Sequence, residues 1–302
     1  MCGLFGFLKY SSIKIDEKNL TESLAAQAAV RGTDAAGVAY NNKGNMEIIK
    51  RAENARRINF RVPNVHALIG HTRHATQGAV KLNYNNHPFI GRAGKNEFAL
   101  AHNGVIMNDK QLRDSLKLPN TKIETDSYIA VQLIESRKKL NMKSIAYMAE
   151  QVQGGFSFSI MDKQNNIYLV KGDSPLCILH FPKRKLYVYA STDDILWKAL
   201  IDTELFADLK RAAYKMINIH EGDILKICSS GRLEHGSFKY SGYCGYDCDW
   251  RSFSVNEPDS YYSDLVSAAS GMGITASEID ELLSYGLTYD EIEEYIYSGM
   301  EV

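Results

Sequence analysis

The sequence predicts an α+β protein in which β-sheets pack face to face and helices lie outside them. Short apolar segments separated by turn residues recur along the first 236 residues, and helical segments interrupt them in the middle of the chain. The composition, 45% hydrophobic and 24% charged residues, is that of a globular protein. Strands grouped around a few helices bury their apolar faces most simply as stacked sheets with outer helices.

The first half of the chain mixes strands and helices. An apolar strand opens the sequence, and a short helix is expected at residues 24–30. Residues 38–40 and 46–50 flank Asn41-Asn42-Lys43-Gly44, a sequence typical of a β-hairpin. Strands are expected at 65–70 and 97–101, each leading into a polar cluster that contains histidine. Helices are expected at 110–116, capped by Asn108 or Asp109, at 126–139, capped by Thr125, and at 143–152.

Strands dominate the second half until the composition changes near residue 236. They are expected at 156–161, 167–170, 176–181, 186–190, 224–228 and 232–235, with one helix from the cap Thr192 to residue 201. Residues 237–260 are interpreted as a linker and 261–302 as an acidic helical tail with helices at 264–269, 277–284 and 289–297. Thr275 and Thr288 stand at capping-box spacing before Glu278 and Glu291. The tail is either a solubilising appendage or a docking element for a partner. No internal repeat stands out.

Charge and cysteine usage narrow the functional classes. The formal net charge of −1 comes without a long block of like charge, which argues against a nucleic-acid or membrane surface. No apolar run is long enough for a membrane span, and no secretory signal is recognisable. Five cysteines are too few, and odd in number, for a disulfide framework, so a cytoplasmic protein is expected. They are Cys2, Cys177, Cys228, Cys244 and Cys248.

Cys2 is the first candidate for catalysis. Removal of Met1, which a small second residue permits, would leave one residue with both a thiol and a free α-amine. The α-amine titrates near ~8 and the thiol near ~8.5, so the amine is a suitable base for the thiol's proton. The alternative is that Cys2 is a small core residue before an ordinary apolar strand. Nothing in the first seven residues alone decides between the two.

Four polar clusters downstream offer the other groups that acyl chemistry needs. Asn103 with Gly104 offers an amide donor and an open backbone N–H for an oxyanion, although Asn-Gly is also a common turn pair. Arg73 and Asp126 are suited to the carboxylate and ammonium of a free amino acid. Taken singly, Arg73 is also explained as a surface ion-pair residue and Asp126 as a helix-start carboxylate. The clusters are residues 31–37, 70–78, 101–105 and 124–127.

In their order along the chain, these segments resemble one family, the class II glutamine amidotransferases with an N-terminal nucleophile. It includes the glutaminase domains of glucosamine-6-phosphate synthase and amidophosphoribosyltransferase. The resemblance covers residues 2–236 and implies a four-layer αββα sandwich. Its motifs are Cys2-Gly3-Leu4-Phe5-Gly6, Arg31-Gly32-x-Asp34-x-Ala36-Gly37, Gly70-His71-Thr72-Arg73, Asn86-His87-Pro88-Phe89, His102-Asn103-Gly104 and Thr125-Asp126.

The resemblance assigns a role to each matching residue. Cys2 would attack the side-chain amide of glutamine to form a thioester, and Asn103 with the Gly104 N–H would hold the oxyanion. Arg73 would bind the substrate carboxylate and Asp126 its ammonium. The backbone of Thr76 and Gln77 would line the pocket, and Arg31 would lie on a loop that couples the glutaminase to an acceptor site.

The sequence also departs from the family. His74 replaces the Trp or Tyr common in relatives, and the synthase domain that follows in the two enzymes named has no counterpart in the last 66 residues. We therefore expect a glutaminase that passes ammonia to a separately encoded synthetase or amidoligase. The alternatives are a stand-alone γ-glutamyl amide hydrolase and a non-catalytic binding module. No cofactor is expected. A metal site is not expected either, because His71, His74, His87 and His102 lack carboxylates at ligand spacing.

Overall fold

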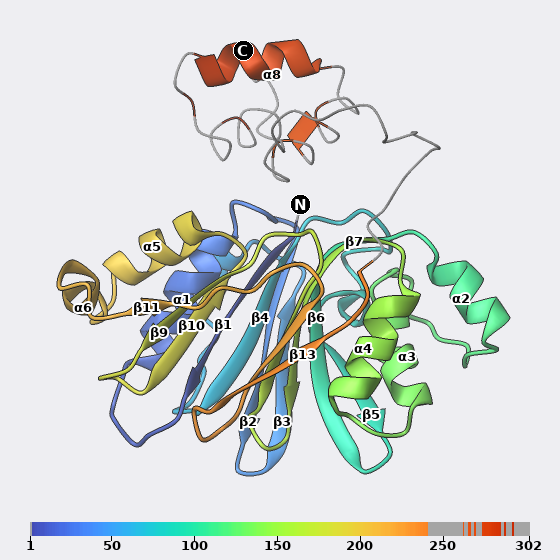
Figure 1. The fold of residues 1–302 in the computed structure, drawn as a ribbon, viewed down its shortest axis with the longest axis horizontal. Coiled ribbons are helices and arrows are strands. Elements are labelled where there is room, and N and C mark those ends of the chain that lie inside the picture. The colour runs from blue at the N-terminus through green and yellow to red at the C-terminus, as the bar shows by residue number, and fades with distance from the viewer. Residues whose placement is uncertain are drawn as a thin grey trace. The chain divides into compact units, whose positions relative to one another are not determined.

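The structure, a computed structural model, describes residues 2–240 and 274–284 together with single positions at 262, 265, 266, 269, 287 and 292. The chain divides into two compact units, Met1–Tyr243 and Cys244–Val302. The first unit contains two β-sheets, all of whose strand pairs are antiparallel (Figure 1).

The larger sheet has seven strands in the order β11-β9-β10-β1-β4-β2-β3. The opening strand β1 lies at its centre, between β10 and β4. Its glycines permit close packing, because a Cβ on Gly6 would lie 2.4 Å from the Leu68 carbonyl oxygen. The strands are β1 (Gly3–Lys9), β2 (Ala35–Asn42), β3 (Asn45–Arg51), β4 (Ala67–Arg73), β9 (Cys177–Phe181), β10 (Leu186–Ala190) and β11 (Lys215–Met216).

The second sheet has six strands in the order β13-β12-β8-β7-β6-β5. Its longest strand, β6, pairs along its length with β7, so that Asn103 lies opposite Ser157 and Gly104 opposite Phe156. The strands are β5 (Phe89–Ala93), β6 (Asn96–Ile106), β7 (Gly154–Asp162), β8 (Ile167–Lys171), β12 (Asp223–Ile227) and β13 (Leu233–Ser237).

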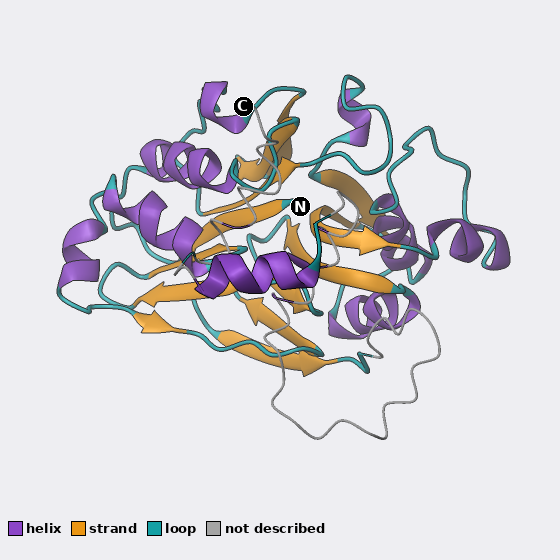
Figure 2. Cartoon of the chain, turned by 90° about the horizontal axis from the view of Figure 1, so that it is seen from above, coloured by secondary structure: helices purple, strands orange, loops and turns teal. Residues whose placement is uncertain are grey.

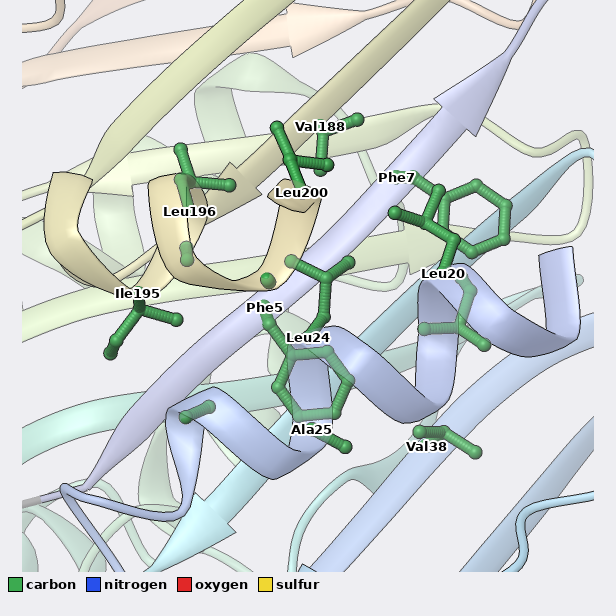
Figure 3. Close-up of a cluster of buried hydrophobic side chains, with 14 of the residues drawn as sticks. Phe5, Phe7, Leu20, Leu24, Ala25, Val38, Val188, Ile195, Leu196 and Leu200 are labelled. Atoms are coloured by element: carbon green, nitrogen blue, oxygen red, sulfur yellow. The ribbon is translucent and has the colours of Figure 1, made fainter. Parts of the chain in front are cut away.

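Helices cover the outer face of each sheet (Figures 1 and 2). Helices α1 (Glu17–Ala28) and α5 (Asp193–Ile201) pack on the first sheet, where Phe5 and Phe7 meet Leu24 and Leu200 (Figure 3). Helices α3 (Tyr128–Ser136) and α4 (Met142–Gln151) pack on the second sheet, where Ile129 belongs to the same buried cluster as Leu100. The shorter helices are α2 (Asp109–Ser115), α6 (Phe206–Lys210), η1 (Ala55–Arg57) and η2 (Asn83–Asn85).

A third apolar cluster fills the space between the sheets. It includes Leu8 of β1, Ile69 of β4, Ala99 of β6 and Tyr189 of β10. The Tyr189 hydroxyl and the Ser159 hydroxyl, one from each sheet, form a hydrogen bond at 2.5 Å. Helix, sheet, sheet and helix are therefore four successive layers, which confirms the predicted αββα sandwich.

Several element boundaries differ from the sequence predictions. Helix α1 begins at Glu17, not 24, because the Asp16 side chain caps its first turn by accepting from the Asn19 N–H. The predicted Thr125 cap is wrong: α3 begins at Tyr128, and the Thr125 hydroxyl forms no hydrogen bond with any described residue. The strand expected to end at 101 continues to Ile106 because β7 pairs with it throughout. Strands β5 and β11 were not predicted.

The described part of the second unit contains α8 (Ala276–Ser284). Its capping box is as predicted, with the Thr275 N–H donating to the Glu278 carboxylate at 2.7 Å. Residues 274–286 and 287–299 share a 13-residue pattern, which corrects the expectation of no repeat. Ile279 and Ile292 occupy equivalent positions in it and both are fully buried in one apolar cluster. The helices expected at 264–269 and 289–297 lie outside the continuously described residues, as does most of the expected linker at 237–260.

No helix among the described residues is long and apolar enough to cross a membrane.

Candidate active site

The predicted site residues gather at one end of the layer between the two sheets. Side chains of a strand alternate between its faces, and Ile69 of β4 and Ala99 of β6 face this layer. Arg73 and Asn103, each four residues further along, therefore face the same layer. Cys2 lies six residues before Leu8, an even number, so its side chain faces the same layer as Leu8. It lies next to Arg73 because Gly3 pairs with Thr72. The hydrogen bond from His71 Nε2 to the His102 carbonyl, 2.8 Å long, joins the two sheets at this end.

Cys2 is held by its backbone. The Arg31 Nε–H donates to the Cys2 carbonyl at 3.0 Å, and the Cys2 thiol lies 3.5 Å from the His74 carbonyl that accepts from it. Gly3 lets this segment approach α1, since a Cβ there would lie 2.9 Å from the Ala28 carbonyl oxygen. Burial raises the pKa of the Cys2 thiol, while the positive charge of Arg73 opposes the shift and the Asp126 carboxylate adds to it. The thiol is therefore protonated near neutral pH and needs a base before it can act as a nucleophile.

Arg73 ends β4 and is almost completely buried. Its Nη1 donates to Asn86 Oδ1 at 2.6 Å, and its Nη2 donates to the Gln77 and Gly78 carbonyls. All three acceptors are uncharged, so no described carboxylate neutralises this guanidinium by direct contact. Burial lowers the pKa of Arg73, and the nearby charges of Cys2, Asp34 and Asp126 oppose this shift.

Asn103 and Gly104 lie within β6 and not in a turn. The Asn103 side chain is 1% exposed, and its Nδ2 has no hydrogen-bond partner among the described residues. A buried amide donor without an acceptor costs about 1–3 kcal/mol, so Nδ2 is free to donate a hydrogen bond to a ligand or a water. Gly104 has a φ of +133°, and a Cβ on it would lie 2.0 Å from the Gly155 carbonyl oxygen. Only glycine fits this position.

Asp126 approaches the site from the loop before α3. Its Oδ2 accepts from the Ile106 N–H at 2.6 Å, at the end of β6, and its Oδ1 accepts from the Ser127 hydroxyl at 3.3 Å. The carboxylate contributes to the electrostatics of both Cys2 and Arg73. An anion and a cation thus flank the thiol, as binding of a zwitterionic amino acid requires.

Comparisons with known proteins bear on the family of the chain. A family profile described as "Glutamine amidotransferase domain" matches residues 71–198. The glutamine–fructose-6-phosphate aminotransferase (isomerizing) of Geobacillus kaustophilus is 34% identical over 189 residues, and the amidophosphoribosyltransferase of Methanocaldococcus jannaschii is 27% identical over 252 residues. These matches cover 59% and 80% of this chain. The chain thus contains a glutamine amidotransferase domain.

The fold agrees as well. The solved structure of glutamine phosphoribosylpyrophosphate amidotransferase from B. subtilis matches 89% of this chain with a TM-score of 0.64 and 19% identity. The aligned parts span only 30% of the aminotransferase and 51% of the M. jannaschii relative. The chain therefore spans less than two thirds of the length of these two relatives.

The remaining predicted residues of the amidotransferase domain lie around the same end of the sheets. Gln77 is half-buried and contacts Arg73 through its carbonyl, whereas Thr76 is exposed. Arg31 is buried against Cys2. Asp34 was not singled out from the sequence, yet its Oδ2 accepts from the Ala75 N–H at 2.8 Å and lies 3.9 Å from His74 Nδ1. Asn86 was quoted only as part of a motif, although it contacts Arg73 directly.

Three histidines of the amidotransferase domain form a buried cluster behind the site. The rings of His71 and His87 lie 4.1 Å apart, and His102 stacks on Phe158 at 4.7 Å while its Nδ1 lies 2.8 Å from the Ser127 hydroxyl. Nδ1 of His71 and both ring nitrogens of His87 make no hydrogen bond with any residue that the structure describes. Among the residues that the structure describes, no group of three His, Cys, Asp or Glu side chains could hold a metal ion.

This histidine cluster predicts that the domain loses stability in acid. Burial lowers the pKa of His71 to about 3 and also lowers the pKa values of His87 and His102. Below pH ~6.5 the unfolded chain binds protons that the folded one excludes, so the free energy of unfolding falls as pH falls. Each proton that the folded state excludes lowers the free energy of unfolding by about 1.4 kcal/mol per unit of decreasing pH.

The measurement is urea unfolding at several pH values between 4.5 and 6.5. A His87→Phe variant is expected to reduce the slope of unfolding free energy against pH by about one proton. His220→Phe, at an exposed histidine outside the cluster, is the matched control. An unchanged slope for the His87 variant would contradict the prediction.

Proposed function

We propose that this domain hydrolyses glutamine to glutamate and ammonia through a thioester on Cys2. The observation that carries the proposal is the set of four groups from separate elements at one end of the inter-sheet layer: a thiol, a guanidinium, a carboxylate and an unpartnered amide donor. They belong to Cys2, Arg73, Asp126 and Asn103. In a class II glutamine amidotransferase, these four groups would bind glutamine and hydrolyse its side-chain amide.

The proposed reaction starts with removal of Met1, which makes the α-amine of Cys2 the general base. The amine takes the thiol proton, and the sulfur attacks the δ-carbon of glutamine. The oxyanion accepts hydrogen bonds from Asn103 Nδ2 and the Gly104 N–H. The amine then gives its proton to the leaving nitrogen, the C–N bond breaks and ammonia departs. Water attacks the thioester, the C–S bond breaks, and glutamate leaves with the thiol restored.

Substrate recognition follows from charge. Arg73 binds the α-carboxylate of glutamine and Asp126 its α-ammonium, which places the side-chain amide toward Cys2 and Asn103. Gln77 and Thr76 contribute pocket backbone in this proposal. Arg31 fixes the Cys2 carbonyl, and through it the position of the nucleophile. The raised pKa of the thiol supports the need for the α-amine as base.

The proposal predicts selective labelling of Cys2 by a glutamine-analogue electrophile. Diazo-oxo-norleucine carries the same carboxylate and ammonium, so it is expected to modify Cys2 stoichiometrically, and glutamine is expected to protect it. The measurement is peptide mass spectrometry of the processed protein together with an assay of ammonia released from glutamine. Cys177 and the buried Cys228, both free thiols, are internal controls. Equal labelling of all three, or none at Cys2, would count against the site.

We also propose that a separately encoded synthetase or amidoligase receives the ammonia in the cytoplasm. What supports an ammonia acceptor is that the aminotransferase relatives are named for transferring an amino group from glutamine to a second substrate. The described cysteines are all free thiols, consistent with a reducing compartment.

A further inference from the structure

A single neutral side chain supports the guanidinium that is proposed to bind the substrate carboxylate. Arg73 is 3% exposed, and its described hydrogen bonds reach only the Asn86 amide oxygen and two backbone carbonyls. These contacts use three of the five N–H groups of a guanidinium. The Nε–H and one Nη1–H make no hydrogen bond with any described residue. Arg73 is thus fixed in direction while its positive charge stays available to a ligand.

Asn86 is itself fully engaged. It is 1% exposed, and its Nδ2 donates to the Val80 carbonyl at 2.8 Å and to Asn83 Oδ1 at 3.2 Å. Since a guanidinium only donates and a carbonyl only accepts, the amide has one orientation that satisfies both sides, with Oδ1 toward Arg73. A flipped amide would place a donor against a donor. The contacts of Asn86 within the loop therefore fix its Oδ1 as the acceptor of the Arg73 Nη1–H.

The backbone of Asn86 is anchored to the neighbouring sheet. Lys50 Nζ of β3 donates to the Asn86 carbonyl at 2.7 Å and lies 5.3 Å from the Phe89 ring centre. Gly37 of β2 allows the backbone of His87, the next residue after Asn86, to approach this strand, because a Cβ on Gly37 would lie 2.3 Å from the His87 carbonyl oxygen. Two strands of the first sheet thus hold the segment that carries the amide.

We infer that Asn86 is a positioning residue that orients Arg73 for a substrate α-carboxylate and, by being uncharged, leaves the charge of Arg73 for that substrate. The inference rests on the proposed function for the identity of the ligand. A carboxylate at position 86 would occupy the same Nη1–H and neutralise the guanidinium, so the protein would carry its own competitor for the α-carboxylate.

The test is equilibrium binding of L-glutamine, measured by calorimetry in a Cys2→Ala background so that no turnover occurs. Asn86→Asp is expected to raise the Kd about 10- to 100-fold, because a charge-assisted hydrogen bond to the substrate is lost. Asn86→Ala, which removes the acceptor without adding charge, is expected to raise it by less, about tenfold or below. Asn45→Asp adds the same charge at an exposed position in the β2–β3 hairpin, outside the contacts described for Asn86 and Arg73, and is the matched control.

Kinetics with Cys2 intact give the second readout. Asn86→Asp is expected to raise KM while kcat changes less than about threefold, and alkylation of Cys2 by iodoacetamide, which has no α-carboxylate, is expected to keep its rate. Unchanged glutamine binding in both Asn86 variants, an effect of Asn86→Ala larger than that of Asn86→Asp, or no glutamine binding at all would overturn the inference. Binding as expected without ammonia release by the Cys2 protein would overturn the proposed function alone.

Discussion

A Cys2→Ala variant is expected to release ammonia from glutamine about four to six orders of magnitude more slowly than the parent protein. Loss of a nucleophile in comparable acyl-transfer enzymes has an effect of this size, because no other group forms the covalent intermediate. Alanine at position 2 still permits removal of Met1, so the variant keeps the α-amine and loses only the sulfur. The measurement is a coupled glutamate or ammonia assay at saturating glutamine.

The control for this prediction is Cys228→Ala, which removes a buried thiol at the end of β12, away from the opening segment. It is expected to keep the parent kcat. Far-UV circular dichroism of both variants separates loss of chemistry from loss of folding. Full ammonia release by Cys2→Ala would rule out the Cys2 thioester.

An Asn103→Leu variant is expected to lower kcat about 10²- to 10³-fold, with a much smaller change in KM. One oxyanion donor contributes this much in acyl-transfer enzymes, and it acts on the transition state more than on the bound substrate. Stability is expected to stay constant or rise, because the variant removes a buried Nδ2 that has no described partner. Loss of activity without loss of stability is the signature that separates a catalytic amide from a structural one.

Asn108→Leu is the matched comparison. Asn108 is also buried, but its Oδ1 accepts from the Gln153 N–H at 2.9 Å and its Nδ2 donates to the Gln151 carbonyl at 2.9 Å. This variant is expected to lose about 1–3 kcal/mol of unfolding free energy and to keep kcat. Thermal unfolding and steady-state kinetics on both proteins check the contrast. If Asn103→Leu is destabilised and keeps its kcat, the amide has a structural role.

The sequence predicted the layers of the fold because periodicity and turn chemistry are local properties. Strands such as 186–190 and the Thr192-capped helix are found as expected. The start of α1 was placed too late because Glu17, Lys18 and Asn19 carry no apolar signal, and the cap at Asp16 acts through its side chain. The short edge strands β5 and β11 depend on partners far along the chain, so local patterns do not indicate them.

Part of the candidate site could likewise be predicted from the sequence, and part could not. Cys2, Arg73, Asn103 and Asp126 were recognisable because their chemical types and order match a family. The Arg73–Asn86 contact was not, since it requires residues 77–86 to fold back on β4, and no periodicity encodes that path. The unpartnered state of Asn103 Nδ2 also became visible only when its surroundings were known.

The central place of β1 has a consequence for the motion of the proposed nucleophile. Terminal segments commonly fray, and local opening exposes their amides to exchange far below the global unfolding free energy. Here the residue after Cys2 already belongs to a strand paired on both sides, and Leu4 through Leu8 are buried. Displacing the thiol by more than a side-chain rotation therefore requires opening the middle of a seven-stranded sheet. We therefore expect the end of the chain that carries the proposed nucleophile to be among the described segments least able to exchange with solvent.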